Sequence, residues 1–262
     1  MSMRGLIMTK RKILKIFLII SFSIISLASA KEKKIIKIGY FVAPTFIYEN
    51  DKQQLVGPLY TFLREIEKMG DYQFVFEKYT NSRMYHEIQA GHLDMMAMSA
   101  KQLEDEYIIN SEIPFMKDKP YLVARSDFKL NKITSVKQLE NLIIGIKQDG
   151  AISNFLLENK DKLKFETSAS TESIYLLLLK LLGKRVDLIH GYSSHVFTYL
   201  ARKNKILDKI KLVEIPGEYS KIYFGFSTKL DMKDRDKLNK LIKYLLLEKK
   251  INLTEQIKNW ND

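Results

Sequence analysis

A short structural unit occurs twice in this 262-residue sequence, and it strongly limits the possible folds. In residues 82–99 an apolar helical pattern ends at Gly91, and an aspartate and an apolar run follow. In residues 174–193 a helical pattern ends at Gly183, and Asp187 again precedes an apolar run. A helix that leads into a short apolar strand is typical of a parallel sheet covered on both faces. Two such units predict two similar α/β lobes.

The remaining segments fit the same architecture. Residues 35–40 and 72–76 have strand patterns, and a helix that begins at Gly57-Pro58 separates them. Further strands or extended segments are predicted over 120–125, 142–146, 211–215 and 221–227, and helices after Ser135, from 151 onward and over 234–244. This order calls for mainly parallel sheets flanked by helices. The expected fold class is α/β, with two lobes and a hinge made of two crossings.

The N-terminus has the pattern of a secretory signal peptide. Basic residues from Arg4 to Lys15 precede the apolar segment 16–27, and Ala28-Ser29-Ala30 fits a cleavage site. A membrane anchor is the alternative, but about 20 apolar residues are needed to cross a bilayer. The sequence contains no cysteine, so it offers no disulfide and no lipidated cysteine. We expect residues 1–30 to be removed and the mature protein to be soluble in the periplasm without a membrane anchor.

Charge and motif content exclude several functions. Removal of residues 1–30 takes away five of the 43 basic residues and none of the 31 acidic ones, and so lowers the net charge from +12 to +7. The remaining lysines are spread over helices rather than gathered with aromatic residues, which does not indicate nucleic-acid binding. The four histidines show no metal-binding pattern, and nucleophile and phosphate-loop motifs are missing. We therefore expect no metal, no cofactor and no catalytic residue.

The order of the parts resembles that of the family 3 extracellular solute-binding proteins, which have the type II periplasmic-binding-protein fold. Short motifs carry the resemblance along nearly the whole mature chain, at residues 36–40, 44–46, 91–94, 114–115, 121, 135–139, 144–146, 183–187 and 260. The resemblance implies two lobes that close on a small ligand. We place residues 31–122 and 224–262 in the first lobe and residues 123–223 in the second. The resemblance also implies that the protein is a monomer and that its partner is an inner-membrane permease complex.

Ligands of open parallel sheets bind at the carboxyl ends of the strands, where helix N-termini also point. The candidate ligand contacts are Phe46, Tyr48, Arg83, Ser99 and Lys101 from the first lobe, and Asp149, Ser153 and Tyr192 from the second. Aromatic residues at these positions can stack on a ligand, and packing at the edge of the core is the alternative. For Arg83 the alternative is a structural salt bridge.

Two ligand anchors that the resemblance implies are missing. Amino-acid binders of the family carry an arginine in the loop after Ser99 that clamps the ligand carboxylate. Here Asp105 has that spacing, and Lys101 is the only cation in the loop. Tyr192 takes the place of the aspartate that holds the ligand amine. These departures argue against an ordinary α-amino acid. Residues 104–106 are acidic and would suit a cationic ligand, unless they form a solvated loop.

The sequence thus predicts a binding protein, not an enzyme. It would capture a small polar solute, amino-acid-like or cationic, for an ABC-type importer, and the ligand would favour the closed state by contacting both lobes. One alternative is a secreted, dehydratase-like enzyme with Glu104, Asp105 or His190 as its acid or base. The other is a sensory binding module without a role in transport.

Overall fold

The structure is a computed structural model that describes residues 33–100, 106–148, 150–170, 172–191, 193–217 and 219–260. The predicted signal peptide, residues 1–30, lies outside the described residues. The fold below belongs to the compact unit Ile35–Asp262. Within the described ranges, none of the helices combines the length and the apolar character needed to span a membrane.

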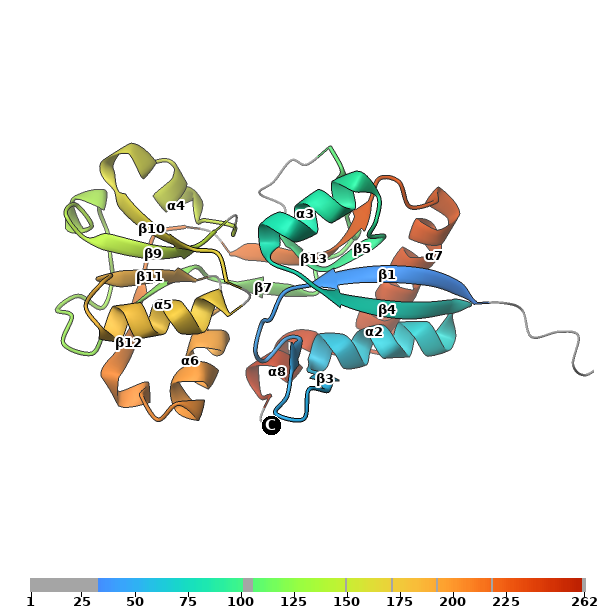
Figure 1. Cartoon of the computed structure of the whole chain (residues 1–262), viewed down its shortest axis with the longest axis horizontal. Coiled ribbons are helices and arrows are strands. Elements are labelled where there is room, and N and C mark those ends of the chain that lie inside the picture. Colours follow the sequence, from blue (N-terminus) through green and yellow to red (C-terminus); the bar gives the residue numbers. More distant parts are fainter. Residues whose placement is uncertain are drawn as a thin grey trace, which may run out of the picture. The chain divides into compact units, whose positions relative to one another are not determined.

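The first lobe is built on a sheet with strand order β4-β1-β5-β13-β6, and β7 pairs with β13 (Figure 1). Strands β1 and β5 are parallel, whereas β13 is antiparallel to β5, β6 and β7. The strands are β1 (Lys34–Tyr40), β4 (Tyr72–Lys78), β5 (Met95–Ala100), β6 (Ile108–Asn110), β7 (Met116–Asp118) and β13 (Ser220–Ser227). A separate hairpin pairs β2 (Tyr48–Glu49) with β3 (Leu55–Val56).

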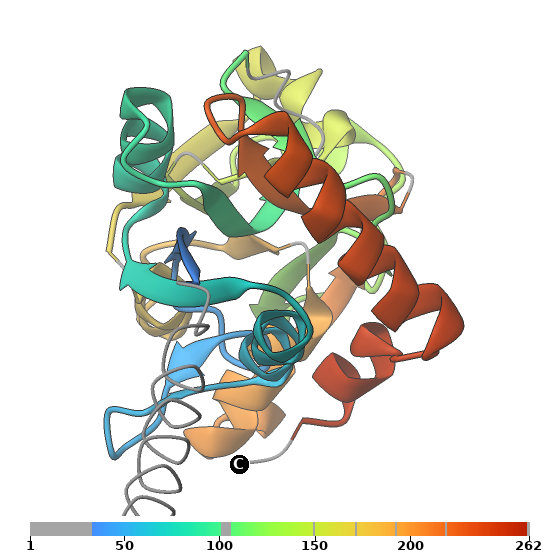
Figure 2. The same cartoon turned by 90° about the vertical axis from the view of Figure 1, so that its right-hand side faces the viewer.

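Helices cover both faces of this sheet. Met96 of β5 packs in a cluster with α3 (Asn81–Ala90), and its neighbours Met95 and Ala97 face the core formed with α2 (Pro58–Met69). Helix α3 ends at Gly91, whose φ of 82° is the left-handed conformation that glycine adopts readily. After α7 (Met232–Lys243), a π-helical turn (Tyr244–Glu248) leads the chain back into α8 (Leu253–Lys258), and both α7 and α8 contact α2 (Figure 2).

The second lobe is built on a sheet with strand order β10-β9-β11-β8-β12 (Figure 1). Strands β9, β10 and β11 are parallel, and β8 is antiparallel to β11 and β12. The elements are β8 (Tyr121–Arg125), β9 (Ile143–Lys147), β10 (Lys164–Ser168), β11 (Leu188–Gly191), β12 (Ile210–Glu214), α4 (Asn154–Leu157), α5 (Ser173–Leu182), α6 (Ser194–Lys203) and the 3-10 turns η1 (Val136–Gln138), η2 (Lys160–Lys162) and η3 (Leu207–Lys209).

The expected α/β class with two helix-flanked sheets is confirmed, but both sheets are mixed rather than mainly parallel, because β8 and β13 run antiparallel to their neighbours. The chain passes from the first sheet to the second between β7 and β8, and it returns between β12 and β13. The cap predicted at Ser135 is present as a capping box with Gln138. The helix predicted from residue 151 begins only at Asn154. The exact lobe limits proposed from the sequence stay a prediction.

The repeated unit is present in both lobes, and its aspartates make the same backbone contacts. Asp94 precedes β5, and its Oδ2 accepts a hydrogen bond of 2.8 Å from the backbone N–H of Lys37 on β1. Asp187 precedes β11, and its Oδ2 accepts one of 2.9 Å from the N–H of Ile143 on β9. Each aspartate N–H donates in return to the carbonyl of the same residue, at 3.0 and 2.9 Å. This aspartate clamp holds two neighbouring parallel strands together in each lobe.

A glycine lies at the same place in each of the clamped strands. A Cβ atom at Gly39 would lie 2.6 Å from Cδ1 of Leu93, and one at Gly145 would lie 2.8 Å from Cδ2 of Leu177. A side chain at either position would require a leucine of the covering layer to shift, because that layer packs closely on the strand backbone. The two lobes therefore resemble each other in how a leucine packs on the sheet as well as in the order of their elements.

We predict that Asp94→Ala and Asp187→Ala each lower the free energy of unfolding by about 1 kcal/mol or more, because each leaves a strand N–H without its acceptor. The effect should be larger for Asp187, whose Oδ1 also lies 3.7 Å from Nη2 of Arg125. Asparagine at either position keeps an acceptor oxygen and should retain most of the stability.

Urea denaturation measures these differences. Asp161→Ala is the matched control, because the exposed Asp161 side chain makes no hydrogen bond or ion pair with the described residues. If the alanine variants were as stable as this control, the clamp would have no role in holding the strands.

Candidate ligand-binding site

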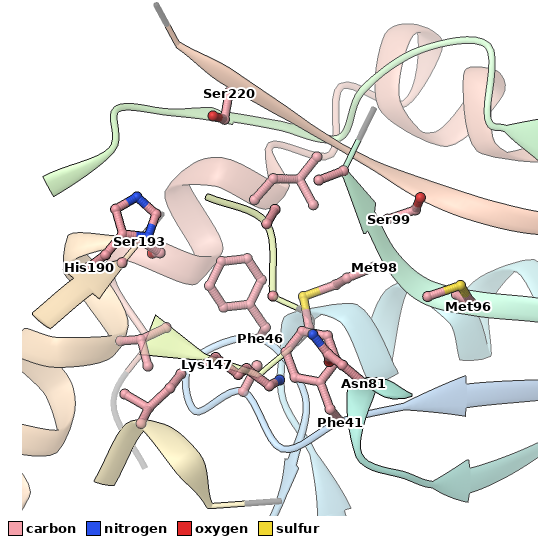
Figure 3. Close-up of a pocket in the computed structure, with 18 of the residues that line it drawn as sticks. Phe41, Phe46, Asn81, Met96, Met98, Ser99, Lys147, His190, Ser193 and Ser220 are labelled. Atoms are coloured by element: carbon pink, nitrogen blue, oxygen red, sulfur yellow. The ribbon is translucent and has the colours of Figure 1, made fainter. Parts of the chain in front are cut away.

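A pocket of about 170 Å³ lies between the two sheets. Its walls come from both lobes, with Phe46 and Met98 on one side and His190 and Ser193 on the other (Figure 3). Sites for drug-sized ligands have volumes of about 300–1,000 Å³. The pocket therefore suits a small metabolite.

The described walls of the pocket are mainly apolar. The apolar lining side chains are Phe41, Ala43, Phe46, Met84, Met96, Met98, Ala100, Ala151, Ile174, Leu177, Val196, Phe197 and Ile222. The polar groups are few, and they come from Asn81, Tyr85, Ser99, Lys147, His190, Ser193 and Ser220. An apolar cavity with a few placed polar groups is the usual form of a small-molecule site.

Lys147 supplies the charge of this pocket. It is the last residue of β9, at the carboxyl end of the three parallel strands, and its side chain extends toward Phe41 of the first lobe (Figure 3). Its Nζ atom lies 3.2 Å from the centre of the Phe41 ring. The atom is buried and has no hydrogen-bond partner among the described residues. Burial lowers the pKa of Lys147 to about 7.

The contact between Lys147 and Phe41 only partly offsets the cost of this burial. Removing an ion from water costs several kcal/mol in a protein. A cation on a desolvated aromatic ring recovers about 2 kcal/mol. The two residues hold corresponding positions in the repeat, because Phe41 follows Gly39 by two residues and Lys147 follows Gly145 by two. Equivalent points of the two lobes thus meet at the pocket.

His190 contributes a buried, uncharged imidazole. It lies on β11, and its Nε2 accepts a hydrogen bond of 3.3 Å from the backbone N–H of Ser153. Burial lowers the pKa of His190 to about 4, so the ring is neutral at pH 7. The neutral ring fixes the turn that precedes α4 and adds no charge to the pocket.

The sequence-predicted contacts fall into three groups. Phe46 and Ser99 line the pocket, and Ser153 is buried next to His190. Tyr48 and Arg83 do not line it. Lys101, Asp149 and Tyr192 lie outside the described residues, as do Glu104 and Asp105. As ligand contacts, all eight stay predictions.

Tyr48 and Arg83 make contacts elsewhere. The Tyr48 hydroxyl accepts a hydrogen bond of 2.9 Å from Nε1 of Trp260, and its ring centre lies 6.1 Å from that of Tyr199 in the second lobe. Arg83 forms an ion pair with Glu87 one turn along α3. The salt bridge considered as the alternative for Arg83 is therefore present.

Phe41 and Lys147 are among the pocket residues that sequence reasoning missed. Lys147 is one of many lysines in a lysine-rich sequence, and its type alone carries no signal. The available signal was its position, two residues after the glycine of the strand that the second copy of the repeat clamps. Within the described ranges, no group of three or more histidine and acidic side chains is arranged to hold a metal ion.

Several proteins of known structure have the same fold. An ancestral arginine-binding protein bound to glutamine matches with a TM-score of 0.73 and 14% identity, over 88% of this chain and 99% of that one. A histidine kinase sensor domain with similarity to periplasmic binding proteins matches with a TM-score of 0.72 and 15% identity, over 87% and 95%. The substrate-binding protein of an amino acid ABC transporter matches with a TM-score of 0.70 and 16% identity, over 86% and 98%.

These likenesses define the class of fold. The chain has the two-lobe α/β fold of the periplasmic binding proteins. No protein-family model matches the sequence, and no curated protein matches it either. At such low identity the likeness establishes the fold and leaves the ligand open.

The buried histidine predicts a specific acid sensitivity. The pKa of His190 is about 4 in the folded protein and about 6.5 in an unfolded chain. Between these values the unfolded state binds the proton more readily, so stability falls as the pH is lowered from 6.5 to 4. His190→Gln removes this titration but keeps an acceptor near Nε2. The decline in unfolding free energy over this range should be smaller by about 2–3 kcal/mol in the variant.

Urea denaturation at pH 4, 5, 6 and 7 tests this expectation, with His86→Gln at an exposed position as the control. Parallel pH profiles for His190→Gln and the unsubstituted protein would show that the buried ring does not cause the acid sensitivity.

Proposed function

We propose that the chain is an extracytoplasmic solute-binding protein that holds a small molecule in the pocket between its lobes. The observation that carries this proposal is that both lobes supply the pocket walls, with Phe46 and Met98 opposite Phe197 and His190. A ligand that touches both lobes at once stabilises their closed arrangement. The fold shared with a glutamine-bound arginine-binding protein supports a binding role.

The proposal extends to transport. After removal of residues 1–30, the mature protein would act in the periplasm as an unanchored monomer of the family 3 solute-binding proteins and deliver its ligand to an ABC-type permease. Two observations support this role. The family's motifs occur in order along the sequence, and the substrate-binding protein of an amino acid ABC transporter has the same fold.

A sensory role is the second candidate, because a histidine kinase sensor domain also shares the fold. A sensory module would signal its closed state to a receptor by protein contact and would leave uptake of the ligand unchanged. An enzymatic role has less support, because the proteins compared above are binding proteins and a sensor domain.

A thermal-shift screen of the mature protein against organic acids, amino acids, polyamines and sugars tests the binding function. A ligand present at 100 times its Kd stabilises the folded state by about 2.7 kcal/mol. In a chain of this size we expect the melting temperature to rise by about 5–10 °C.

A cavity-filling variant makes this test specific for the pocket. Met98→Trp should abolish the shift, because Met98 is 8% exposed and lines the pocket. Met232→Trp, at a position that is 63% exposed, should leave the shift intact. If no compound of these classes shifted the melting temperature, the binding function would be wrong.

Uptake distinguishes transport from sensing. Cells that produce this chain should accumulate the radiolabelled ligand, and deletion of the chain should lower the initial uptake rate at submicromolar ligand by tenfold or more. Unchanged uptake after deletion would favour the sensory candidate. Mass spectrometry of the ligand after incubation with the protein gives the third outcome, since a changed mass would identify an enzyme.

A further inference from the structure

The buried ammonium of Lys147 indicates which kind of ligand the pocket takes. An ammonium carries three N–H donors and no acceptor. The Nζ atom has no hydrogen-bond partner among the described residues, and its close neighbour, the Phe41 ring at 3.2 Å, offers a π face but no lone pair. The donors of Lys147 are therefore available to a ligand that enters the pocket.

The charge of the described lining favours an anionic ligand. Lys147 is the only lysine, arginine, aspartate or glutamate among the described residues that line the pocket, and His190 is neutral there. A cationic ligand would meet a like charge with no carboxylate in these walls to offset it. An anion would hold Lys147 in its protonated form and pair with the buried ammonium, and such pairing is strong away from water.

A single cation fits a carboxylate better than a phosphate. A phosphate group carries up to two charges and three or more acceptor oxygens, and several donors usually hold it. The described lining offers one ammonium together with hydroxyl groups of Ser99, Ser193 and Ser220. A carboxylate, with one negative charge and two acceptor oxygens, matches one ammonium and these hydroxyl groups.

The rest of the pocket favours an apolar ligand body. Phe41, Phe46 and Met98 form an apolar wall on the first lobe, and Leu177 and Phe197 form one on the second. An α-ammonium group is held best by a carboxylate, and the described lining contains no carboxylate; its side-chain acceptors are the neutral amide of Asn81 and hydroxyl oxygens. A hydrocarbon or aromatic body loses nothing by leaving water for these walls and gains the hydrophobic contribution.

We propose that the ligand is a small monocarboxylate with an apolar body, and that Lys147 is the anchor for its carboxylate. This inference rests on the binding function proposed above. The carboxylate attaches the ligand to the end of β9 in the second lobe, and the apolar body packs on Phe46 and Met98 of the first lobe. One molecule thereby bridges both lobes.

The test compares carboxylates with their uncharged amides. The mature protein is titrated with benzoate, 3-phenylpropionate and hexanoate, each against the corresponding amide, at constant ionic strength by calorimetry and thermal shift. Phosphate, lysine, putrescine and glucose complete the set. At least one carboxylate should bind tenfold or more tightly than its amide, and phosphate should not bind.

Lys147→Met then tests the anchor. The variant should bind the best carboxylate about 10–100-fold more weakly, because a charge-assisted contact is lost, and it should bind the amide within threefold of the unsubstituted protein. Lys240→Met, at an exposed position on α7, is the control and should change neither value. Lys147→Gln serves as the second variant, and circular dichroism verifies that each variant is folded.

The outcomes separate the inference from the function on which it rests. Carboxylate binding that Lys147→Met and Lys147→Gln leave unchanged would overturn the role of Lys147. Binding of only amino acids, polyamines, phosphate or sugars would overturn the ligand class but keep the solute-binding function. A protein that binds no compound of any class would overturn the proposed function as well.

Discussion

The aspartate clamp between neighbouring parallel strands is the constraint on which the pocket depends. In each lobe the carboxylate and the backbone N–H of one aspartate hold the first half of the adjacent strand. The clamp fixes the register, which pairs Ile38 with Met95 and Ile144 with Leu188. A shift by one residue would exchange the two faces of a strand. The clamp lies before the N-terminal ends of β5 and β11, and the pocket lies at their carboxyl ends. The clamp therefore determines which side chains of these strands face the pocket.

At the pocket, the two lobes have similar backbones but different side chains. The two copies of the repeat place residues at equivalent points, but one copy supplies the aromatic ring of Phe41 and the other the ammonium of Lys147. The charged group is buried at a net cost to the stability of the protein. Binding sites commonly retain such locally unfavourable groups, because a ligand compensates for them. The same residue pair thus joins the two lobes and indicates which chemistry a ligand must bring.

Much of the fold was predictable because it follows from local patterns. The helix, glycine, aspartate and strand of each repeat are close in sequence, and so are Ser135 and Gln138 of the capping box. Helix α6 was not predicted, although Ser193 at its N-cap position was an available signal. Helix α4 is only four residues long, which removes the helix N-terminus expected near Asp149.

The site was less predictable because its contacts join distant parts of the chain. Tyr48 was expected at the ligand from its loop position, but its hydroxyl accepts a hydrogen bond from Trp260, which lies 212 residues later in the sequence. Lys147 matters because it meets Phe41 of the other lobe, a contact that no local pattern encodes. Arg83 is the exception, since a salt bridge was its alternative and the partner Glu87 lies four residues along the same helix. The sequence suggested a small polar solute, whereas the described walls of the pocket are mainly apolar.

Strand β13 has a consequence for how the protein is made. It lies between β5 and β6 in the first sheet, although the ribosome synthesises it after every strand of the second sheet. A nascent chain therefore has all strands of the second sheet before the first sheet receives this internal strand. Until then β5 and β6 have unpaired edges, which are the part of a sheet most prone to aggregation. Chaperones that shield exposed strand edges would be needed most for the half of the protein that is synthesised first and completed last.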